Sequence, residues 1–319
     1  NCFVNDHIMI LSHHPLIFNK LKSVRSDFYV GGIIHKLIKN DINVYCAHTN
    51  LDIAFGGVND VLAKNLNLVQ VKPLEILKYD NLKKIVVFVP KDHVDSVVNA
   101  MANAGAGWIG NYSHCSFKTP GKGTFKPLEG SNPYIGKAGQ IEEVEEYRIE
   151  MIVLNSKFRK VVNEMLKSHP YEEVAYDIYN LDNLGEPVGL GRIGKLSEPT
   201  ILKNLVSNVK NLLKVDYVRI VGDINKKINK IAVCGGSGAS LIHKSVAKGA
   251  DVLVTSDVKY HQAQEAFNLG LQIVDVGHWD SEKLVLPTII DEIKTSLTKA
   301  NLKTQIINSK INERFLEFV

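Results

Sequence analysis

The sequence is poor in cysteine. Its 319 residues include only Cys2, Cys46, Cys115 and Cys234, and no two of these form a CxxC pair. This scatter argues against a thiolate zinc site and against a disulfide framework, which both need characteristic cysteine spacings. It is typical of proteins from a reducing compartment, so we expect a cytoplasmic location.

Other features are absent as well. The sequence has no apolar run long enough to cross a membrane, and no basic segment of the kind that opens a signal peptide. The net charge of +4 is slight for this length and gives no sign of the basic face that nucleic-acid binding requires. The chain also lacks an initial methionine and begins almost directly in an expected strand, so we expect that an N-terminal segment is missing from it.

Strands and helices alternate at both ends of the chain. Ile8–Leu11 predicts a buried strand, Phe28–Asn40 a helix and "INVYC" a second strand, which together favour a parallel βαβ unit. The same alternation returns from Ile231 onward and ends with a long helix, kinked at Pro287, and a strand in "KTQIINS". The sequence therefore predicts an α/β fold with a two-lobed core of parallel-type βαβ units.

The middle of the chain follows a different pattern. Two strand–helix pairs, "KKIVVFVPKDHVDSVVNAMANAG" and "YRIEMIVLNSKFRKVVNEMLKSH", flank a Gly-rich loop region at Thr119–Gly139. A doubled strand–helix half predicts an inserted ferredoxin-like α+β domain. The predicted domains are core lobe one at residues 1–82, the insertion at 83–182 and core lobe two at 183–319.

Two adjacent histidines, His13 and His14, follow the first strand. Neighbouring side chains on a strand point to opposite faces, so both can serve one site only where the strand has ended. Pro15 marks such a turn. Ligands of parallel sheets bind at the carboxyl ends of strands, and Asp52 stands just beyond the end of the second strand. A surface loop that carries two imidazoles is the alternative that these residues leave open.

The pair His278 and Glu282 opens a helix directly after another strand. Residues four apart share one face of a helix, so this imidazole and this carboxylate can hold the same metal ion or two adjacent ions. The alternative is an exposed helix start, where Asp280 and Glu282 merely favour the helix dipole. The histidine turn and the Asp52 turn together favour the metal interpretation.

These candidate ligands offer only imidazole nitrogen and carboxylate oxygen, a set that suits zinc, iron or manganese. Five side chains are more than one tetrahedral ion needs. The count predicts two divalent ions per chain, bridged by Glu282 or Asp52, with a shared water as the nucleophile.

Three further side chains are candidates for the reaction itself. His48 and His261 are candidate proton shuttles, because a neutral imidazole titrates near working pH. Lys259 is a candidate anchor for an anionic group, and an ordinary surface lysine is the equal alternative. The turn Gly235–Gly238 is a candidate phosphate cradle, although a simple tight turn explains it as well.

Five segments, "SHHPLIF", "AHTNLD", "CGGSG", "SDVKYH" and "GHWDSE", resemble in this order the Ngg-interacting-factor-three-like family. Its bacterial members are often labelled GTP cyclohydrolase I type 2 homologs or dinuclear metal-binding proteins. The resemblance implies a dinuclear metal centre, a toroidal homohexamer and an inserted domain similar to PII and CutA proteins. It also sets His48 and His261 close to the metals. Carried onto this sequence, the family's metal ligands fall on His13, His14, Asp52, His278 and Glu282.

We therefore expect a dinuclear-metal protein that works as a hydrolase on a nucleotide or another phosphate-bearing small molecule. The alternative from a different functional class is a metal-binding regulatory or scaffold protein. In that case the inserted domain would bind an effector or a partner protein. Analogy of fold does not decide between the two.

Overall fold

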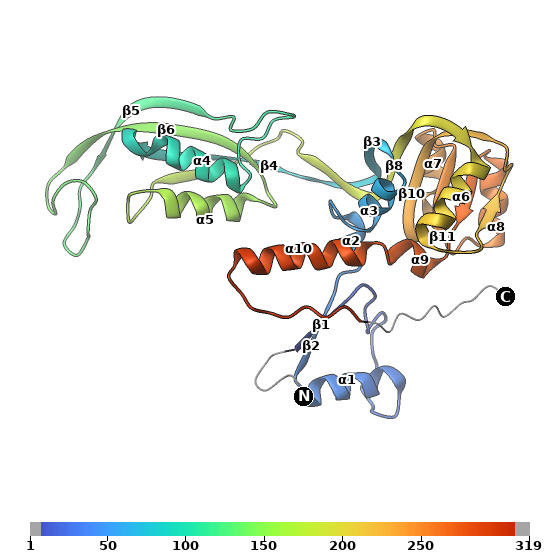
Figure 1. The fold of residues 1–319 in the computed structure, drawn as a ribbon. Coiled ribbons are helices and arrows are strands. Elements are labelled where there is room, and N and C mark those ends of the chain that lie inside the picture. Colours follow the sequence, from blue (N-terminus) through green and yellow to red (C-terminus); the bar gives the residue numbers. More distant parts are fainter. Residues whose placement is uncertain (1–7, 310–319) are drawn as a thin grey trace. The chain divides into compact units, whose positions relative to one another are not determined.

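The computed structural model describes residues 8–309, which form two compact units (Figure 1). Residues 8–77 and 188–309 make up the core unit, and residues 78–187 make up the inserted unit. The boundaries of separately folding domains stay a prediction. Cys2 lies outside the described residues, within which Cys46, Cys115 and Cys234 are free thiols. In this part of the chain no helix has the length and apolar character needed to cross a bilayer.

The core unit is built on a six-stranded mixed sheet. Its strands are ordered β3-β8-β10-β11-β12-β9. Three central strands, β10, β11 and β12, run parallel, as the sequence predicts, whereas β8 is antiparallel to β10 and β9 is antiparallel to β12. The strands are β3 (Val69–Asp80), β8 (Glu186–Ile201), β9 (Arg219–Val221), β10 (Lys227–Ser237), β11 (Val252–Ser256) and β12 (Gln272–Asp275).

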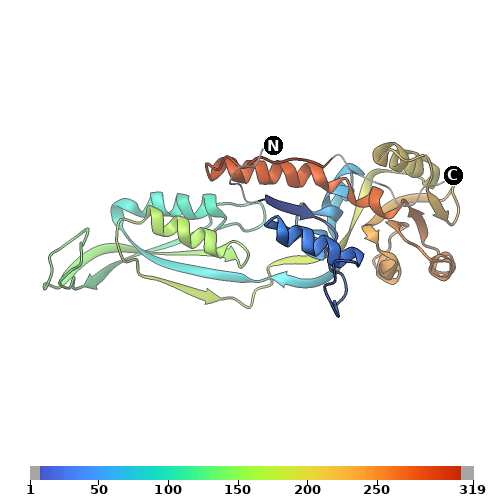
Figure 2. The same cartoon turned by 90° about the horizontal axis from the view of Figure 1, so that it is seen from below.

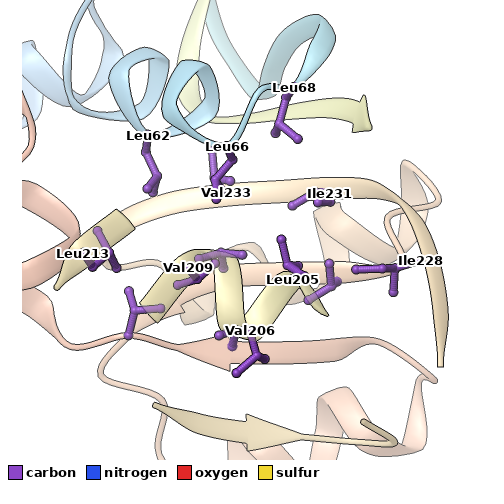
Figure 3. Close-up of a cluster of buried hydrophobic side chains, with 14 of the residues drawn as sticks. Leu62, Leu66, Leu68, Leu205, Val206, Val209, Leu213, Ile228, Ile231 and Val233 are labelled. Carbon is purple, nitrogen blue, oxygen red and sulfur yellow. The ribbon is translucent and has the colours of Figure 1, made fainter. Parts of the chain in front are cut away.

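Alternate residues of these strands point to opposite faces, and helices cover both faces. On one face, Leu62 of α3 (Val58–Asn65) and Leu66, directly after this helix, pack in one cluster with Val233 of β10 (Figure 3). Val209 of α6 (Leu202–Leu213) belongs to the same cluster. On the other face, Leu253 packs with residues of α7 and α8. These two helices are α7 (Ile242–Ala247), preceded by the 3-10 turn η2 (Ala239–Leu241), and α8 (Tyr260–Asn268).

The first segment of the core unit is a small parallel βαβ unit. Strands β1 (Ile8–Ser12) and β2 (Ile42–Cys46) pair in parallel, and helix α1 (Tyr29–Lys39) lies between them in the chain. The expectation of a buried first strand is wrong, because Met9 keeps 66% of its surface exposed. A sheet of only two strands is too small to bury its faces. The chain then enters α2 (Thr49–Ile53) and α3.

The carboxyl-terminal part of the core unit also differs from expectation. The predicted single long helix is two helices, α9 (His278–Glu282) and α10 (Val285–Lys299), and the break precedes Pro287. Pro287 stands in the first turn of α10, where a helix does not need its missing N–H. Residues 303–309 form no strand, so the predicted closing strand is wrong.

The inserted unit runs β-α-β-β-α-β along the chain and forms a four-stranded antiparallel sheet of order β5-β6-β4-β7. Both helices cover one face of this sheet (Figures 1 and 2) and share a core that includes Met101 and Met165. The elements are β4 (Leu82–Pro90), η1 (Lys91–His93), α4 (Val94–Ala104), β5 (Phe117–Phe125), β6 (Glu142–Leu154), α5 (Phe158–Ser168) and β7 (Tyr176–Asn180).

Strand β5 occupies part of the region that the sequence assigns to a Gly-rich loop. Gly121 and Gly123 lie within the strand, opposite Glu146 and Val144 of β6. A Cβ atom at Gly123 would overlap the carboxylate of Glu146, which is buried. The glycine therefore makes room for a side chain of the neighbouring strand, and its presence here does not indicate a loop.

His169 is buried in the inserted unit and held on both ring nitrogens. Its Nε2 donates to the carbonyl of Phe88 at 2.9 Å, and the backbone N–H of Tyr171 donates to its Nδ1 at 3.1 Å. Burial lowers the pKa of His169, and the carbonyl of Phe88 offsets only part of that effect. The side chain is thus a neutral core histidine, consistent with the absence of any ligand pattern around it in the sequence.

Candidate metal centre

His13 and His14 stand where β1 ends, and the turn directs both imidazoles to one place. Ser12 Oγ donates to the carbonyl of His14 at 2.9 Å and fixes the turn. Nδ1 of His13 lies 2.7 Å from the carbonyl of Ala47, just beyond β2. A carbonyl can only accept, so Nδ1 carries the proton and the lone pair of Nε2 is free for another partner. The centroids of the two rings are 5.0 Å apart.

Glu282 lies at the centre of the cluster. Its Oε1 is 3.1 Å from Nε2 of His278 and 3.5 Å from Nε2 of His13. Its Oε2 is 3.4 Å from Nε2 of His14. The Nε2 atoms of His14 and His278 are 3.1 Å apart. Residues from the two ends of the chain therefore converge on one carboxylate.

Asp52 and His48 complete the cluster from α2 and the residue before it. Oδ1 of Asp52 lies 3.7 Å from Nε2 of His13, and the ring of His48 lies 5.2 Å from that of His13 and 5.4 Å from that of His14. Potential ligand atoms gather within 4.8 Å of one another in two groups, His13 with His14 and His48, and His14 with His278 and Glu282. All five predicted ligands thus lie in one cluster.

The ligand-bearing segments are tied to the end of β10. The side chain of Asn59 donates to the carbonyl of Asp52 at 2.9 Å and accepts from the backbone N–H of Gly235 at 2.9 Å. The backbone N–H of Gly236 donates to Ser281 Oγ at 2.9 Å, beside Glu282. These hydrogen bonds involve buried or half-buried groups, where water does not compete for them. They therefore hold the segments that carry Asp52 and Glu282 in place.

Buried Arg192 of β8 provides a further restraint. Its guanidinium pairs with Asp60 of α3 and donates to the carbonyls of Gly189 and Gly191 at 2.8 and 2.9 Å. It also reaches the carbonyl of Ala54, at 3.2 Å, just after α2. A planar guanidinium with five donors is suited to such a junction, which anchors the turn that follows Asp52.

His278 and Glu282 each stabilise the charged form of the other. The hydrogen bond with Glu282 raises the pKa of His278 to about 9 against the effect of burial, and Asp257 contributes in the same direction. Burial alone would raise the pKa of Glu282, but His13 and His278 outweigh it and lower that pKa to about 2. Glu282 therefore keeps its charge at neutral pH although it is buried.

The outer groups of the cluster respond in different ways. Burial raises the pKa of Asp52, and the neighbouring His13 offsets only part of that rise. Burial also lowers the pKa of His14 and, together with the nearby His13 and His278, outweighs the attraction of Glu282. For His13, burial is the largest single effect and lowers the pKa, but Glu282, the carbonyl of Ala47 and Asp52 together outweigh it and raise the pKa. Two neighbouring carboxylates with opposite shifts are typical of functional sites.

The cluster has a buried side and an open side. The side chains of His13 and Glu282 are only 11% and 10% exposed, whereas that of His14 is 55% exposed and that of His278 37%. A small molecule can therefore approach the two outer imidazoles from solvent while the inner groups stay fixed.

Lys259 and His261 lie outside this cluster. Lys259 precedes α8, His261 is on its first turn, and both are exposed. The ring centroid of His261 lies 5.6 Å from that of Tyr260, and His261 belongs to neither of the two groups of candidate ligand atoms. Their assignment as anion anchor and proton shuttle stays a prediction.

The turn Gly235–Gly238 does not offer the free N–H groups of a phosphate cradle. Those of Gly235 and Gly236 already serve Asn59 and Ser281, and that of Gly238 donates to Thr255 Oγ1 at 2.9 Å. Of the two interpretations of this turn, these hydrogen bonds favour the tight turn over the phosphate cradle, because the donors already hold the site together. The alternative of a tight turn describes it.

Several contributing residues have no assigned role in the sequence interpretation. Asp257 accepts from Nδ1 of His278 at 2.5 Å, and it follows β11 directly. Its place at a strand end is visible in the sequence, but its partner is not. Asn59 gives no signal at all, because an asparagine in a helix has many ordinary uses.

Comparison with known proteins supports the assignment of all these segments to one protein type. The profile of the family Duf34/NIF3 (NGG1p interacting factor 3) matches residues 2–314. A Halalkalibacterium halodurans protein called GTP cyclohydrolase 1 type 2 homolog is 47% identical over 311 residues, which are 98% of this chain and 83% of that protein. A Bacillus subtilis protein of the same name is 48% identical over 277 residues, 87% of this chain and 74% of its own.

A solved structure agrees. The crystal structure of a Bacillus cereus protein related to NIF3 superposes with a TM-score of 0.81 at 47% identity. The superposition covers 98% of this chain and 83% of that one. The mixed α/β architecture described above is therefore that of an experimentally determined relative.

Proposed function

The chain belongs to the Duf34/NIF3 family, and on that premise we propose that it binds two divalent metal ions and hydrolyses a nucleotide or another phosphate-bearing small molecule. The proposed ligands are His13, His14, Asp52, His278 and Glu282. The proposed metals are zinc, iron or manganese, which the nitrogen and oxygen donors of this cluster suit.

The observation that carries the proposal is a pair of buried atoms without partners. Nε2 of His13 and Oδ1 of Asp52 are buried and make no hydrogen bond, and they lie 3.7 Å apart. A buried polar atom left unpaired costs about 1–3 kcal/mol, so native proteins rarely keep two side by side. A divalent cation would satisfy both atoms, because it takes a neutral imidazole nitrogen and a carboxylate oxygen as ligands.

The arrangement around Glu282 supports two ions rather than one. One carboxylate oxygen faces His13 and His278 and the other faces His14, so this side chain is the better candidate for the bridge. Asp52 lies at the His13 side and reaches no other imidazole of the ligand set within salt-bridge distance. We therefore assign the bridging role to Glu282 and a terminal role to Asp52.

The metals, when bound, would lower the pKa of a shared water and polarise a phosphate or carbon centre. The chain's own residues provide the rest. His48 lies beside His13 and His14 and is the better-placed proton carrier, since its ring nitrogen groups with theirs and that of His261 does not. The exposed side at His14 admits the substrate, and Lys259 would meet a negatively charged group.

For the inserted unit we propose a ferredoxin-like fold of the PII/CutA type. The β-α-β-β-α-β order and the sheet order β5-β6-β4-β7 support this assignment. A regulatory or scaffold function is the second candidate, and the separate core of this unit favours it. We further propose a cytoplasmic location, which the free cysteines support.

We also propose a homo-oligomer, in line with the homohexamer that the family resemblance implies. The exposed apolar side chains of Met9 and Tyr29 support this proposal.

Metal content tests the proposal directly. Protein purified without chelator should hold about two divalent ions per chain, as a two-metal site requires. His13→Ala and Glu282→Ala should each lower the occupancy. His93→Ala should not, because His93 contacts Tyr134 in the inserted unit. Full occupancy in all three variants would refute the ligand assignment.

Function is tested by titration of metal-loaded protein with inorganic phosphate and nucleotides, followed by turnover assays with and without chelator. We expect phosphate to bind at the metals and Asp52→Asn to weaken both binding and turnover, because the variant removes a charge that holds the cations. Nucleotide binding that survives removal of the metals and maps to residues 78–187, without turnover, would favour the regulatory function.

A further inference from the structure

Two imidazoles of the cluster are held in the same manner from behind. Nδ1 of His13 faces the carbonyl of Ala47 at 2.7 Å, and Nδ1 of His278 faces the carboxylate of Asp257 at 2.5 Å. In both rings Nε2 then points toward Glu282. An acceptor behind Nδ1 keeps the proton there and leaves the lone pair of Nε2 for a ligand on the other side.

The backbone around Asp257 is built to hold this contact. Asp257 has a φ of 57°, in the left-handed region that few residues other than glycine adopt. Buried Asp275, at the end of β12, accepts from the backbone N–H of Val258 at 3.1 Å and from that of Gly277 at 3.3 Å. These two N–H groups belong to the residue after Asp257 and the residue before His278. One carboxylate thus fixes both ends of the Asp257–His278 contact.

Arg219 extends this support. Its guanidinium pairs with the same oxygen of Asp275 that accepts from Val258, so β9 and β12 hold the acceptor in place. The chain therefore supplies a connected set of hydrogen bonds from Arg219 through Asp275 to the turn that carries Asp257. A surface aspartate without a role would not need such a support.

We propose that Asp257 is a positioning residue, which orients His278 and commits its Nε2 to the metal. The inference deepens the proposed function and depends on it. Loss of such an outer hydrogen-bond partner typically lowers metal affinity by about 10–100-fold. The competing explanation is that Asp257 only serves the left-handed turn, since aspartate is one of the residues that tolerates this conformation.

Glycine separates the two explanations, because it accepts a positive φ and removes the carboxylate. Asp257→Gly should therefore weaken cobalt(II) binding, measured against a competing chelator, by about 10–100-fold. Asn67→Gly is the matched control, since Asn67 also has a left-handed φ, of 55°, and is exposed away from the cluster. It should bind cobalt(II) like the wild type.

A second readout does not depend on affinity. In zinc-loaded wild-type protein labelled with nitrogen-15 histidine, His278 should carry its proton on Nδ1, with slow exchange against water, and bind through Nε2. Asp257→Asn keeps the backbone conformation but can donate as well as accept, so the Nδ1 proton should exchange faster. This variant also preserves the test if Asp257→Gly does not fold.

The outcomes are distinct. Equal cobalt(II) affinity of the wild type and Asp257→Gly overturns the inference and leaves the proposed metal site intact. Zinc bound through Nδ1 of His278 overturns it too. Wild-type protein that binds neither cobalt(II) nor zinc overturns the proposed function, and this inference falls with it. Tight cobalt(II) binding by the wild type and by Asn67→Gly, with weaker binding by the Asp257 variants, supports both the proposed metal site and the positioning role of Asp257.

Discussion

A single methyl group at Gly236 should disable the metal centre although every proposed ligand is retained. Gly236 has a φ of 62°, and a Cβ atom built there would overlap Oε1 of Glu282 and lie 3.3 Å from Nε2 of His278. Ordinary van der Waals contact begins at 3.4 Å, so the carboxylate must move by about 1 Å. Metal sites tolerate ligand displacements of only about 0.2 Å.

The magnitude follows from two separable costs. Alanine in the left-handed region costs about 1–2 kcal/mol, which lowers the melting temperature of a unit of this size by about 2–8 °C. The displaced carboxylate adds a loss of metal affinity of at least about 10–100-fold, or about 1.4–2.8 kcal/mol. A glycine with a positive φ and no atom near its added Cβ should show only the backbone cost and no loss of metal affinity.

Gly270→Ala provides that control. Gly270 has a φ of 74° and no atom within 4 Å of its added Cβ, so the substitution lowers stability only through the unfavourable backbone conformation. Both variants should lose similar thermal stability when no metal is added, and only Gly236→Ala should lose zinc affinity in a chelator competition. Equal zinc affinity of the two variants would show that Glu282 does not need its position against β10, and the reasoning would fail.

Three more outcomes are expected. Arg192→Ala should destabilise the core unit by about 3–5 kcal/mol in urea unfolding, because it leaves Asp60 without its buried partner; the exposed ion pair of Arg25 is the control, and Arg25→Ala should cost no measurable stability. A result below about 1 kcal/mol for Arg192→Ala would contradict the buried-pair argument. Burial lowers the pKa of His169, so the folded state binds its proton less readily than the unfolded state. Stability should be complete above pH 6.5 and decline as the pH falls through that value, and a His169→Asn variant with the same pH slope as the wild type would refute this. Replacement of residues 83–182 by a short Gly/Ser linker should leave metal binding in place, and an insoluble or metal-free product would show that the insertion completes the core.

Much of the candidate site could be predicted from the sequence because parallel strands impose a simple rule. Side chains that follow the carboxyl ends of β1 and β2, which pair in parallel, gather at one edge of their two-stranded sheet, and these are the places of His13 and Asp52. The same rule places His278 at the end of β12, in the six-stranded sheet. The four-residue spacing of His278 and Glu282 adds helical periodicity, which a sequence shows directly. These rules place each ligand within its own segment, but the meeting of His13 with His278 at Glu282 joins two different sheets, which no single segment determines.

The remaining features depend on contacts between distant segments. The left-handed φ at Asp257 and its hydrogen bond to His278 join two strand ends that are separated by a helix. The strand β5 contains two glycines that the sequence favours as loop residues, and it is stabilised by pairing with β6. The apolar run of β1 predicts burial, but burial depends on how many neighbours a strand finds, which no single segment determines.

The glycine-rich turn at the end of β10 shows how contacts decide between two interpretations that a motif leaves open. A glycine-rich turn between a strand and a helix is a common phosphate site, because its backbone N–H groups are free. Here the N–H of Gly235 holds Asn59 and thereby the backbone of Asp52, and the N–H of Gly236 holds Ser281 beside Glu282. The same donors that would bind an anion instead assemble the two carboxylates that a cation needs. Glycine is required for this because Glu282 lies against the backbone of Gly236, so the turn and the candidate metal centre are one structural unit.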